Sequence, residues 1–156
     1  CEMTLIDAVE QVNQRRKPVL ANKVIARLGD DLSAVRVALL GLAFKPGTDD
    51  LRESPLVTLA EQFLGRGYEL RVLDAYVEQS RLISQNKAFV DEHLPHIASL
   101  LVAAPGDLDS CAVIVVGHPV AEDDLARWLD AGVEVVDLVS LDGDHTGRPN
   151  YHGLYW

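Results

Sequence analysis

Apolar and polar positions follow two different patterns along this chain. From residue 35 onward, short and nearly continuous apolar runs are separated by longer stretches in which apolar residues recur at helical spacing. Continuous apolar runs are typical of strands that are covered on both faces of a sheet. We therefore predict strands at residues 35–42, 70–73, 112–117 and 133–139, with a short extra strand at 100–103.

The stretches between these strands predict helices at residues 55–66, 77–94 and 122–131. Strands that alternate with helices are joined by right-handed crossovers and form a parallel sheet. The predicted fold is therefore α/β: a three-layer, Rossmann-like parallel sheet over residues 33–142.

The two ends of the chain differ from this repeat. Residues 4–28 predict a long amphipathic helix that Pro18 breaks or kinks. This helix either serves as a connector or subunit contact or packs on its own domain, and the pattern does not choose between the two. Residues 143–156 are rich in Gly, His, Pro and aromatic residues and predict an irregular tail. We expect Tyr151, Tyr155 and Trp156 to pin that tail to a surface.

Composition narrows the class of protein. At 156 residues the chain can bury one real core, and a net charge of −10 argues against a nucleic-acid-binding surface. The sequence has no apolar run of membrane-spanning length and no signal segment, so we expect no membrane partner and a cytoplasmic location. The chain begins at Cys1 without an initiator methionine, which suggests a fragment or a processed product.

The segment after the first strand contains the strongest candidates for ligand-binding residues. Residues 44–55 read FKPGTDDLRESP, which places Lys45 and Arg52 at the carboxyl edge of the sheet, where open α/β sheets bind ligands. Ser54 and Pro55 form a good helix start, and a helix N-terminus beside two cations is a candidate anion site. The alternative is a solvated loop with surface ion pairs, and composition alone favours that alternative.

Other candidate residues fit structural roles at least as well. The first turn lacks G-x-G-x-x-G, so direct dinucleotide binding by this domain alone is not supported. Asp74 ends the second strand but lies too far from Gly41 for the usual ribose-binding acid, so a turn-initiating role is favoured. His118 follows the third long strand, where a hydrogen-bonded loop residue is commoner than an acid–base group.

No metal site or nucleophile is expected in this chain. Pro95 lies between His93 and His96 and breaks the helix that would align them, and no third ligand is evident. We expect Cys111 to be a small buried apolar residue. Cys1 has no base or cationic surroundings in the sequence, so it receives no role.

Residues 44–55 also resemble the signature of the C-terminal domain of the UDP-glucose/GDP-mannose dehydrogenase family. The resemblance is strongest over residues 35–75 and extends weakly over nearly the whole chain. Within the family the chain looks more like the branch that oxidises GDP-mannose, because of LPHIASLLV at residues 94–102 and G-x-x-W at residues 153–156.

This resemblance implies an NAD-dependent nucleotide-sugar 6-dehydrogenase that converts GDP-mannose to GDP-mannuronate, for an acidic exopolysaccharide such as alginate. Family members use two NAD per turnover and a cysteine that holds thiohemiacetal and thioester intermediates. The resemblance implies that residues 1–32 are the end of a central dimerisation helix and that residues 33–142 cover the sugar-nucleotide. It also implies that this domain works with the enzyme's own NAD-binding domain and that the enzyme is a homo-dimer or higher homo-oligomer. By the family pattern, Phe44 and Lys45 contact the sugar-nucleotide and Arg52 reaches NAD.

The chain also departs from the family pattern. Cys1 does not lie in a segment like that of the family nucleophile, so we expect no catalytic residue here and no turnover by this chain alone. Three alternatives stay open: a UDP-glucose or other UDP-hexose 6-dehydrogenase, a non-catalytic nucleotide-binding module, and a dimerisation module built on residues 4–28.

Overall fold

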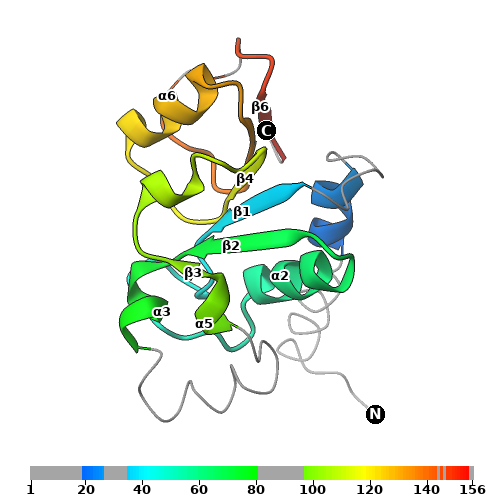
Figure 1. The fold of residues 1–156 in the computed structure, drawn as a ribbon, viewed down its shortest axis with the longest axis vertical. Coiled ribbons are helices and arrows are strands. Elements are labelled where there is room, and N and C mark those ends of the chain that lie inside the picture. The colour runs from blue at the N-terminus through cyan, green and yellow to red at the C-terminus, as the bar shows by residue number, and fades with distance from the viewer. Residues whose placement is uncertain (1–18, 27–34, 81–96, 144, 146, 155–156) are drawn as a thin grey trace, which may run out of the picture.

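The structure is a computed structural model that describes residues 19–26, 35–80, 97–143, 145 and 147–154. Its centre is a six-stranded sheet with the order β3-β2-β1-β4-β5-β6, and every neighbouring pair of strands is parallel (Figure 1). The strands are β1 (Arg36–Leu40), β2 (Glu69–Leu73), β3 (Leu101–Val102), β4 (Val113–Val116), β5 (Glu134–Asp137) and β6 (Tyr151–Gly153).

Helices cover both faces of the sheet because the strand side chains alternate between two cores. Val37 and Leu39 of β1 belong to one buried cluster and Ala38 and Leu40 to the other. The first cluster includes residues of α2 (Pro55–Gly65) and of the helical residues 19–26, and the second includes Trp128 of α6 (Glu122–Asp130). The remaining elements are α3 (Ala75–Ser80), α5 (Ile97–Leu100) and the 3₁₀ helix η1 (Pro105–Leu108).

The predicted three-layer α/β architecture is confirmed. Each predicted strand has its counterpart within a few residues, and the helices predicted at 55–66 and 122–131 correspond to α2 and α6. The helix predicted at 77–94 coincides with α3 only as far as Ser80, because residues 81–96 lie outside the described residues. Of the helix predicted at 4–28, residues 19–26 are helical and the rest lies outside, so the division into connector, domain and tail stays a prediction.

The tail differs from the irregular segment that was expected. Residues 151–153 form β6, which pairs with β5 and carries the sheet beyond residue 142. The Asn150 side-chain amide anchors the turn before β6 by donating to the carbonyls of Leu129 and Val133, at 3.0 and 2.8 Å. Tyr151 is half-buried as expected, whereas Tyr155 and Trp156 lie outside the described residues.

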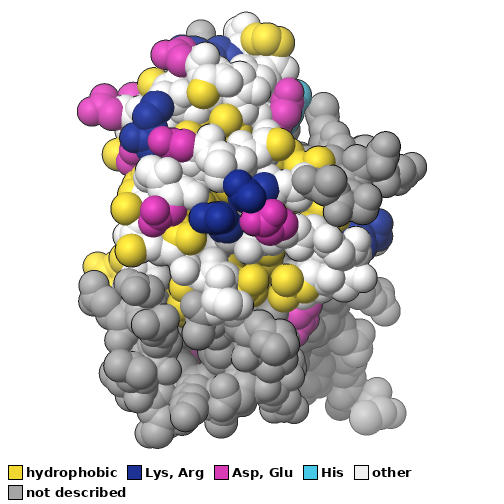
Figure 2. All heavy atoms as spheres, viewed as in Figure 1, with side chains coloured by type: hydrophobic (Ala, Val, Ile, Leu, Met, Phe, Trp, Pro, Cys, Tyr) yellow, Lys and Arg dark blue, Asp and Glu magenta, His cyan; other side chains and the backbone are white. Residues whose placement is uncertain are grey.

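The surface carries charges of both signs. Figure 2 shows basic side chains lying beside acidic ones on one face of the molecule. Arg36 forms an ion pair with Glu69, with 2.7 Å between Nε and Oε1. Within the part of the chain that the structure describes, no helix has both the length and the apolar character needed to cross a membrane.

Candidate functional site

The strand order creates a switch point between β1 and β4. From β1 the chain builds the sheet outward through β2 and β3, and it then builds in the opposite direction through β4, β5 and β6. Ligands of open α/β sheets bind in the crevice outside the carboxyl ends of the strands at such a point. The loops that meet there are residues 41–54 after β1 and residues 117–121 after β4.

Gly41 allows these two loops to approach each other. Its φ angle is +89°, and a Cβ at this position would lie 2.3 Å from the His118 ring. The His118 Nε2 is 3.0 Å from the carbonyl oxygen of Ala43. Because a carbonyl can only accept, Nε2 carries the proton and donates it. His118 is thus a hydrogen-bonded loop residue, as the sequence favoured.

Asp74 fixes the start of the loop after β1. Its side chain is buried, and Oδ2 accepts from the backbone N–H groups of Leu42 and Ala43 at 2.8 and 3.1 Å. Its Oδ1 accepts from the N–H groups of Tyr76 and Val77 at the start of α3, both at 3.2 Å. The favoured turn-initiating role is confirmed, and the four bonds leave little capacity for a ribose.

Phe44 and Lys45 follow directly on this fixed segment. The Phe44 N–H donates to the Asp50 carbonyl at 2.8 Å, which closes the loop and leaves the Phe44 side chain 53% exposed. The Lys45 ammonium lies 5.8 Å from the centroid of the Phe44 ring. Among the described residues, no carboxylate forms an ion pair with Lys45. An aromatic face and a cation are therefore presented together at the switch point.

Arg52 is also presented at this edge, but it has a partner. Its Nε and Nη2 atoms donate to the two oxygens of Asp50, each at 2.9 Å, and its side chain is 72% exposed. The Arg52 guanidinium holds the pKa of the Asp50 carboxyl below its ordinary value, chiefly through these side-chain hydrogen bonds. The surface ion pair that the sequence left open is therefore present in this loop.

The helix start after the loop is formed as predicted. Ser54 is buried, and its Oγ accepts from the Leu56 N–H at 3.2 Å. Pro55 is the first residue of α2, where a missing N–H costs nothing. The N-terminus of α2 therefore lies at the carboxyl edge of the sheet, directly after the loop that carries Lys45 and Arg52.

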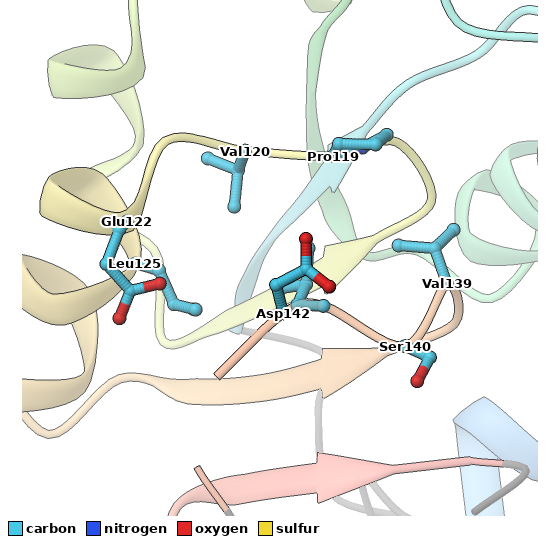
Figure 3. A pocket seen from close by; sticks show the side chains of 8 residues that line it. Pro119, Val120, Glu122, Leu125, Val139, Ser140 and Asp142 are labelled. Atoms are coloured by element: carbon cyan, nitrogen blue, oxygen red, sulfur yellow. The ribbon is translucent and has the colours of Figure 1, made fainter. Parts of the chain in front are cut away.

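A cavity of about 280 Å³ lies beside the switch point (Figure 3). It is formed by the loop after β4 with the start of α6 and by the loop after β5. Its lining residues are Pro119, Val120, Glu122, Leu125, Val139, Ser140, Leu141 and Asp142. Sequence reasoning missed this cavity because its walls are mostly ordinary apolar residues from two separate segments.

Asp137 at the end of β5 holds the second of these loops. The side chain is fully buried, and its oxygens accept from the N–H groups of Val139 and Leu141, each at 2.8 Å. The Tyr151 hydroxyl also donates to this carboxylate. Ser140, between the two bonded residues, has a φ angle of +58°. These bonds give the loop after β5 a defined conformation.

Of the remaining candidates, Cys111 lies among the described residues, away from these loops at the start of β4. Cys111 is buried, and burial raises the pKa of its thiol, so it fits the apolar role that the sequence predicted. Cys1, His93 and His96 lie outside the described residues. Within those residues, no cluster of three His, Cys, Asp or Glu side chains could hold a metal ion.

A parallel α/β sheet with a charged loop, fixed by Asp74, at its switch point defines a Rossmann-like domain. Residues 38–138 match the family described as "UDP-glucose/GDP-mannose dehydrogenase family, UDP binding domain". The chain belongs to this family, which confirms the resemblance of residues 44–55.

Individual relatives agree with this assignment. A GDP-mannose 6-dehydrogenase of Pseudomonas aeruginosa is 45% identical over 128 residues, which cover 78% of this chain and 28% of the relative. The crystal structure of a ternary complex of GDP-mannose dehydrogenase from Pseudomonas aeruginosa is similar with a TM-score of 0.70 and 37% identity, covering 96% of this chain and 33% of that one. A UDP-glucose dehydrogenase of Pyrobaculum islandicum gives a TM-score of 0.59 and 28% identity, with coverages of 96% and 32%. The chain thus spans about a third or less of these relatives.

Proposed function

We propose that this chain is the C-terminal, substrate-binding part of an NAD-dependent GDP-mannose 6-dehydrogenase that forms GDP-mannuronate. The observation that carries the proposal is the pairing of exposed Phe44 and Lys45 on a loop that Asp74 fixes at the switch point. The 45% identity to a GDP-mannose 6-dehydrogenase supports the choice of substrate.

In this proposal the Lys45 ammonium neutralises the diphosphate and the Phe44 ring packs against the sugar-nucleotide. Asp74 and His118 contribute by holding the backbone just before Phe44. A loop held in advance loses less conformational entropy when the ligand binds. The chain then contributes binding and orientation, while the nucleophilic cysteine belongs to another part of the enzyme.

NAD, when bound, accepts the hydride from the substrate. The first turn of this domain has no G-x-G-x-x-G, so the enzyme's own NAD-binding domain supplies most of that site. Arg52 suits a smaller contribution because its guanidinium is exposed and oriented by Asp50. Donation to an anionic oxygen of NAD is the contact expected of it.

The wider setting follows from the same proposal. The product is an acidic sugar-nucleotide, which suits the synthesis of an acidic exopolysaccharide such as alginate. We place the enzyme in the cytoplasm as a homo-dimer or higher oligomer. A UDP-hexose 6-dehydrogenase is the second candidate, favoured by the "UDP binding domain" description of the matching family.

The first test is NADH production by the longer natural enzyme, offered GDP-mannose and UDP-glucose in parallel. We expect two NADH per GDP-mannose and little NADH from UDP-glucose. Turnover of UDP-glucose instead assigns the enzyme to the second candidate. The absence of NADH from both substrates contradicts the proposed reaction.

A further inference from the structure

We propose that His118 is a positioning residue for the sugar-nucleotide, and that a proton on its Nδ1 tightens the loop that carries Phe44 and Lys45. This inference rests on the proposed function, because the loop that His118 holds is the loop proposed to contact the substrate. It adds a dependence on pH, and it predicts that binding of the sugar-nucleotide takes up a proton.

Ala43 is the residue through which three loops are joined. Its N–H donates to the Asp74 Oδ2 at 3.1 Å, and its carbonyl accepts from the His118 Nε2 at 3.0 Å. Asp74 follows β2 and His118 follows β4, so both backbone groups of Ala43 are held from the two strands that flank β1. Because Phe44 is the next residue, its position depends on both contacts.

The His118 ring is enclosed between these partners. Its side chain is 15% exposed, and that of Asp74 is 3% exposed. The ring lies so close to Gly41 that a Cβ there would be 2.3 Å from it. The second ring nitrogen, Nδ1, lies 3.8 Å from the Asp74 Oδ2. His118 thus contacts the site loop through one nitrogen and faces the carboxylate that fixes this loop through the other.

The charge on the ring decides whether the contact at Nδ1 is favourable. While Nε2 donates to Ala43, the neutral ring has a lone pair on Nδ1, which does not attract a carboxylate. A proton on Nδ1 makes the ring an imidazolium and converts the same 3.8 Å contact into an ion pair in largely buried surroundings. This distance is longer than a hydrogen bond, so the N–H groups already bonded to Asp74 stay in place.

The groups around the ring allow this proton to respond to a ligand. The ion pairs of the described residues give His118 one acidic partner, Asp74. From the loop after β1 the ring meets Gly41 and the Ala43 carbonyl, which do not titrate. The loop after β4 reads GHPVA over residues 117–121 and contains no other charged residue. The next charge along the loop after β1 is Lys45, which a bound diphosphate neutralises.

Binding and protonation therefore favour each other. A loop that is held more firmly loses less conformational entropy when the ligand binds, and the negative charge of a diphosphate at this edge favours the imidazolium. By linkage, a proton that tightens the sugar-nucleotide is itself bound more tightly in the complex. Histidine ordinarily changes its charge between about pH 5 and about pH 8, so the affinity should change within that range.

The test is isothermal titration calorimetry of the longer natural enzyme with GDP-mannose in the absence of NAD, so that binding is measured without turnover. GDP-mannose is the suitable probe because, unlike GDP, it has no terminal phosphate that titrates near about pH 6. We expect the affinity of the unchanged enzyme to rise about fivefold from about pH 8 to about pH 6. Titrations at about pH 7 in two buffers of different ionisation enthalpy should show uptake of a fraction of a proton.

His118→Asn is the decisive variant, because its amide can still donate to the Ala43 carbonyl but does not titrate. It should bind GDP-mannose at about pH 8 within about twofold of the unchanged enzyme and lose most of the rise toward about pH 6. His118→Ala has neither property and should bind about fivefold more weakly already at about pH 8.

His152→Asn is the matched control. The His152 Nε2 also faces a carboxylate, with 2.6 Å to the Glu134 Oε2, but His152 lies in β6, which β4 and β5 separate from β1. This variant should keep the affinity, the pH dependence and the proton uptake of the unchanged enzyme.

The outcomes separate this inference from the proposed function. If His118→Asn keeps the pH dependence and the proton uptake of the unchanged enzyme, the role of His118 is wrong and the proposed function stands. The same holds if the unchanged enzyme binds GDP-mannose equally well at every pH. Absence of GDP-mannose binding by the unchanged enzyme at every pH contradicts the proposed function, and this inference with it.

Discussion

A single buried carboxylate determines where the site loop begins. Asp74 accepts four backbone N–H groups, two from the loop after β1 and two from the start of α3. Hydrogen bonds to a charged acceptor are stronger than neutral ones, and a buried carboxylate needs them to offset its lost hydration. Phe44 and Lys45 therefore project from a backbone that is held in one place.

We expect Asp74→Asn to lower the free energy of unfolding by about 2 kcal/mol. The asparagine amide oxygen can replace one of the two carboxylate oxygens as an acceptor. The amide nitrogen takes the place of the other oxygen, and because it is a donor it cannot accept from the backbone N–H groups that it faces. Urea unfolding followed by far-UV circular dichroism measures the change. Asp123→Asn, at an exposed position, should change stability by less than about 0.5 kcal/mol. Equal losses in the two variants would refute the bridging role of Asp74.

The sequence predicted only half of the hydrogen bonds that Asp74 accepts. An aspartate at the end of a strand indicates a turn or helix start, and Asp74 does accept from Tyr76 and Val77. Its bonds to Leu42 and Ala43 join residues more than thirty positions apart. No local pattern predicts which loop a carboxylate will face, because that depends on which strands become neighbours.

Among the strands of the described residues, β6 is the one that the sequence pattern did not predict. Its three residues are too few to show an alternation of apolar and polar positions, and Gly and His weaken the strand signal. The strand forms because β5 offers unpaired backbone groups and because Tyr151 bonds to Asp137. By contrast, α2 was predictable, since Ser54, Pro55 and the apolar spacing all mark it locally.

The hydrogen bond from the Tyr151 hydroxyl to Asp137, which holds β6, makes the folding stability of the domain depend on pH on the alkaline side. Burial, followed by the hydrogen bond to Asp137, raises the pKa of Tyr151 above its ordinary value of 10.0. Below that ordinary value both the folded and unfolded states hold the proton, so the stabilisation is complete. Above it the unfolded tyrosine ionises first, so folding stability falls as the pH rises, by at most about 1.4 kcal/mol per pH unit.

Tyr151→Phe should therefore flatten the loss of stability between about pH 9 and about pH 11. Phenylalanine keeps the ring but has no hydroxyl to titrate, and it should also lower stability at neutral pH because Asp137 loses one donor. Urea unfolding at several pH values measures both effects. Tyr76→Phe, at a tyrosine that is 55% exposed, is the matched control and should keep the slope of the unchanged chain. An unaltered slope in Tyr151→Phe would argue against this anchor.

At the scale of the whole molecule, the strand order brings separate segments together. The chain has a net charge of −10, and its switch-point loop presents the Lys45 ammonium beside an Arg52 guanidinium that is paired with Asp50. Residues 44–55 indicated this part of the site in advance because they carry a cap, turn residues and cations in one run. The cavity could not be predicted in the same way, since it exists only after β4 and β5 lie side by side.

The last prediction concerns the contact between this domain and the rest of the enzyme. We expect Arg52→Ala in the longer enzyme to raise the KM for NAD about tenfold while leaving the KM for GDP-mannose within about twofold, since one charge-assisted hydrogen bond at an exposed site is lost. Steady-state NADH kinetics at saturating GDP-mannose measure the change. Arg66→Ala, which removes an exposed arginine at the other end of α2, is the matched control and should leave both constants unchanged. If Arg52→Ala leaves the KM for NAD unchanged, or raises the KM for GDP-mannose instead, Arg52 belongs to the sugar-nucleotide site or to the Asp50 ion pair alone.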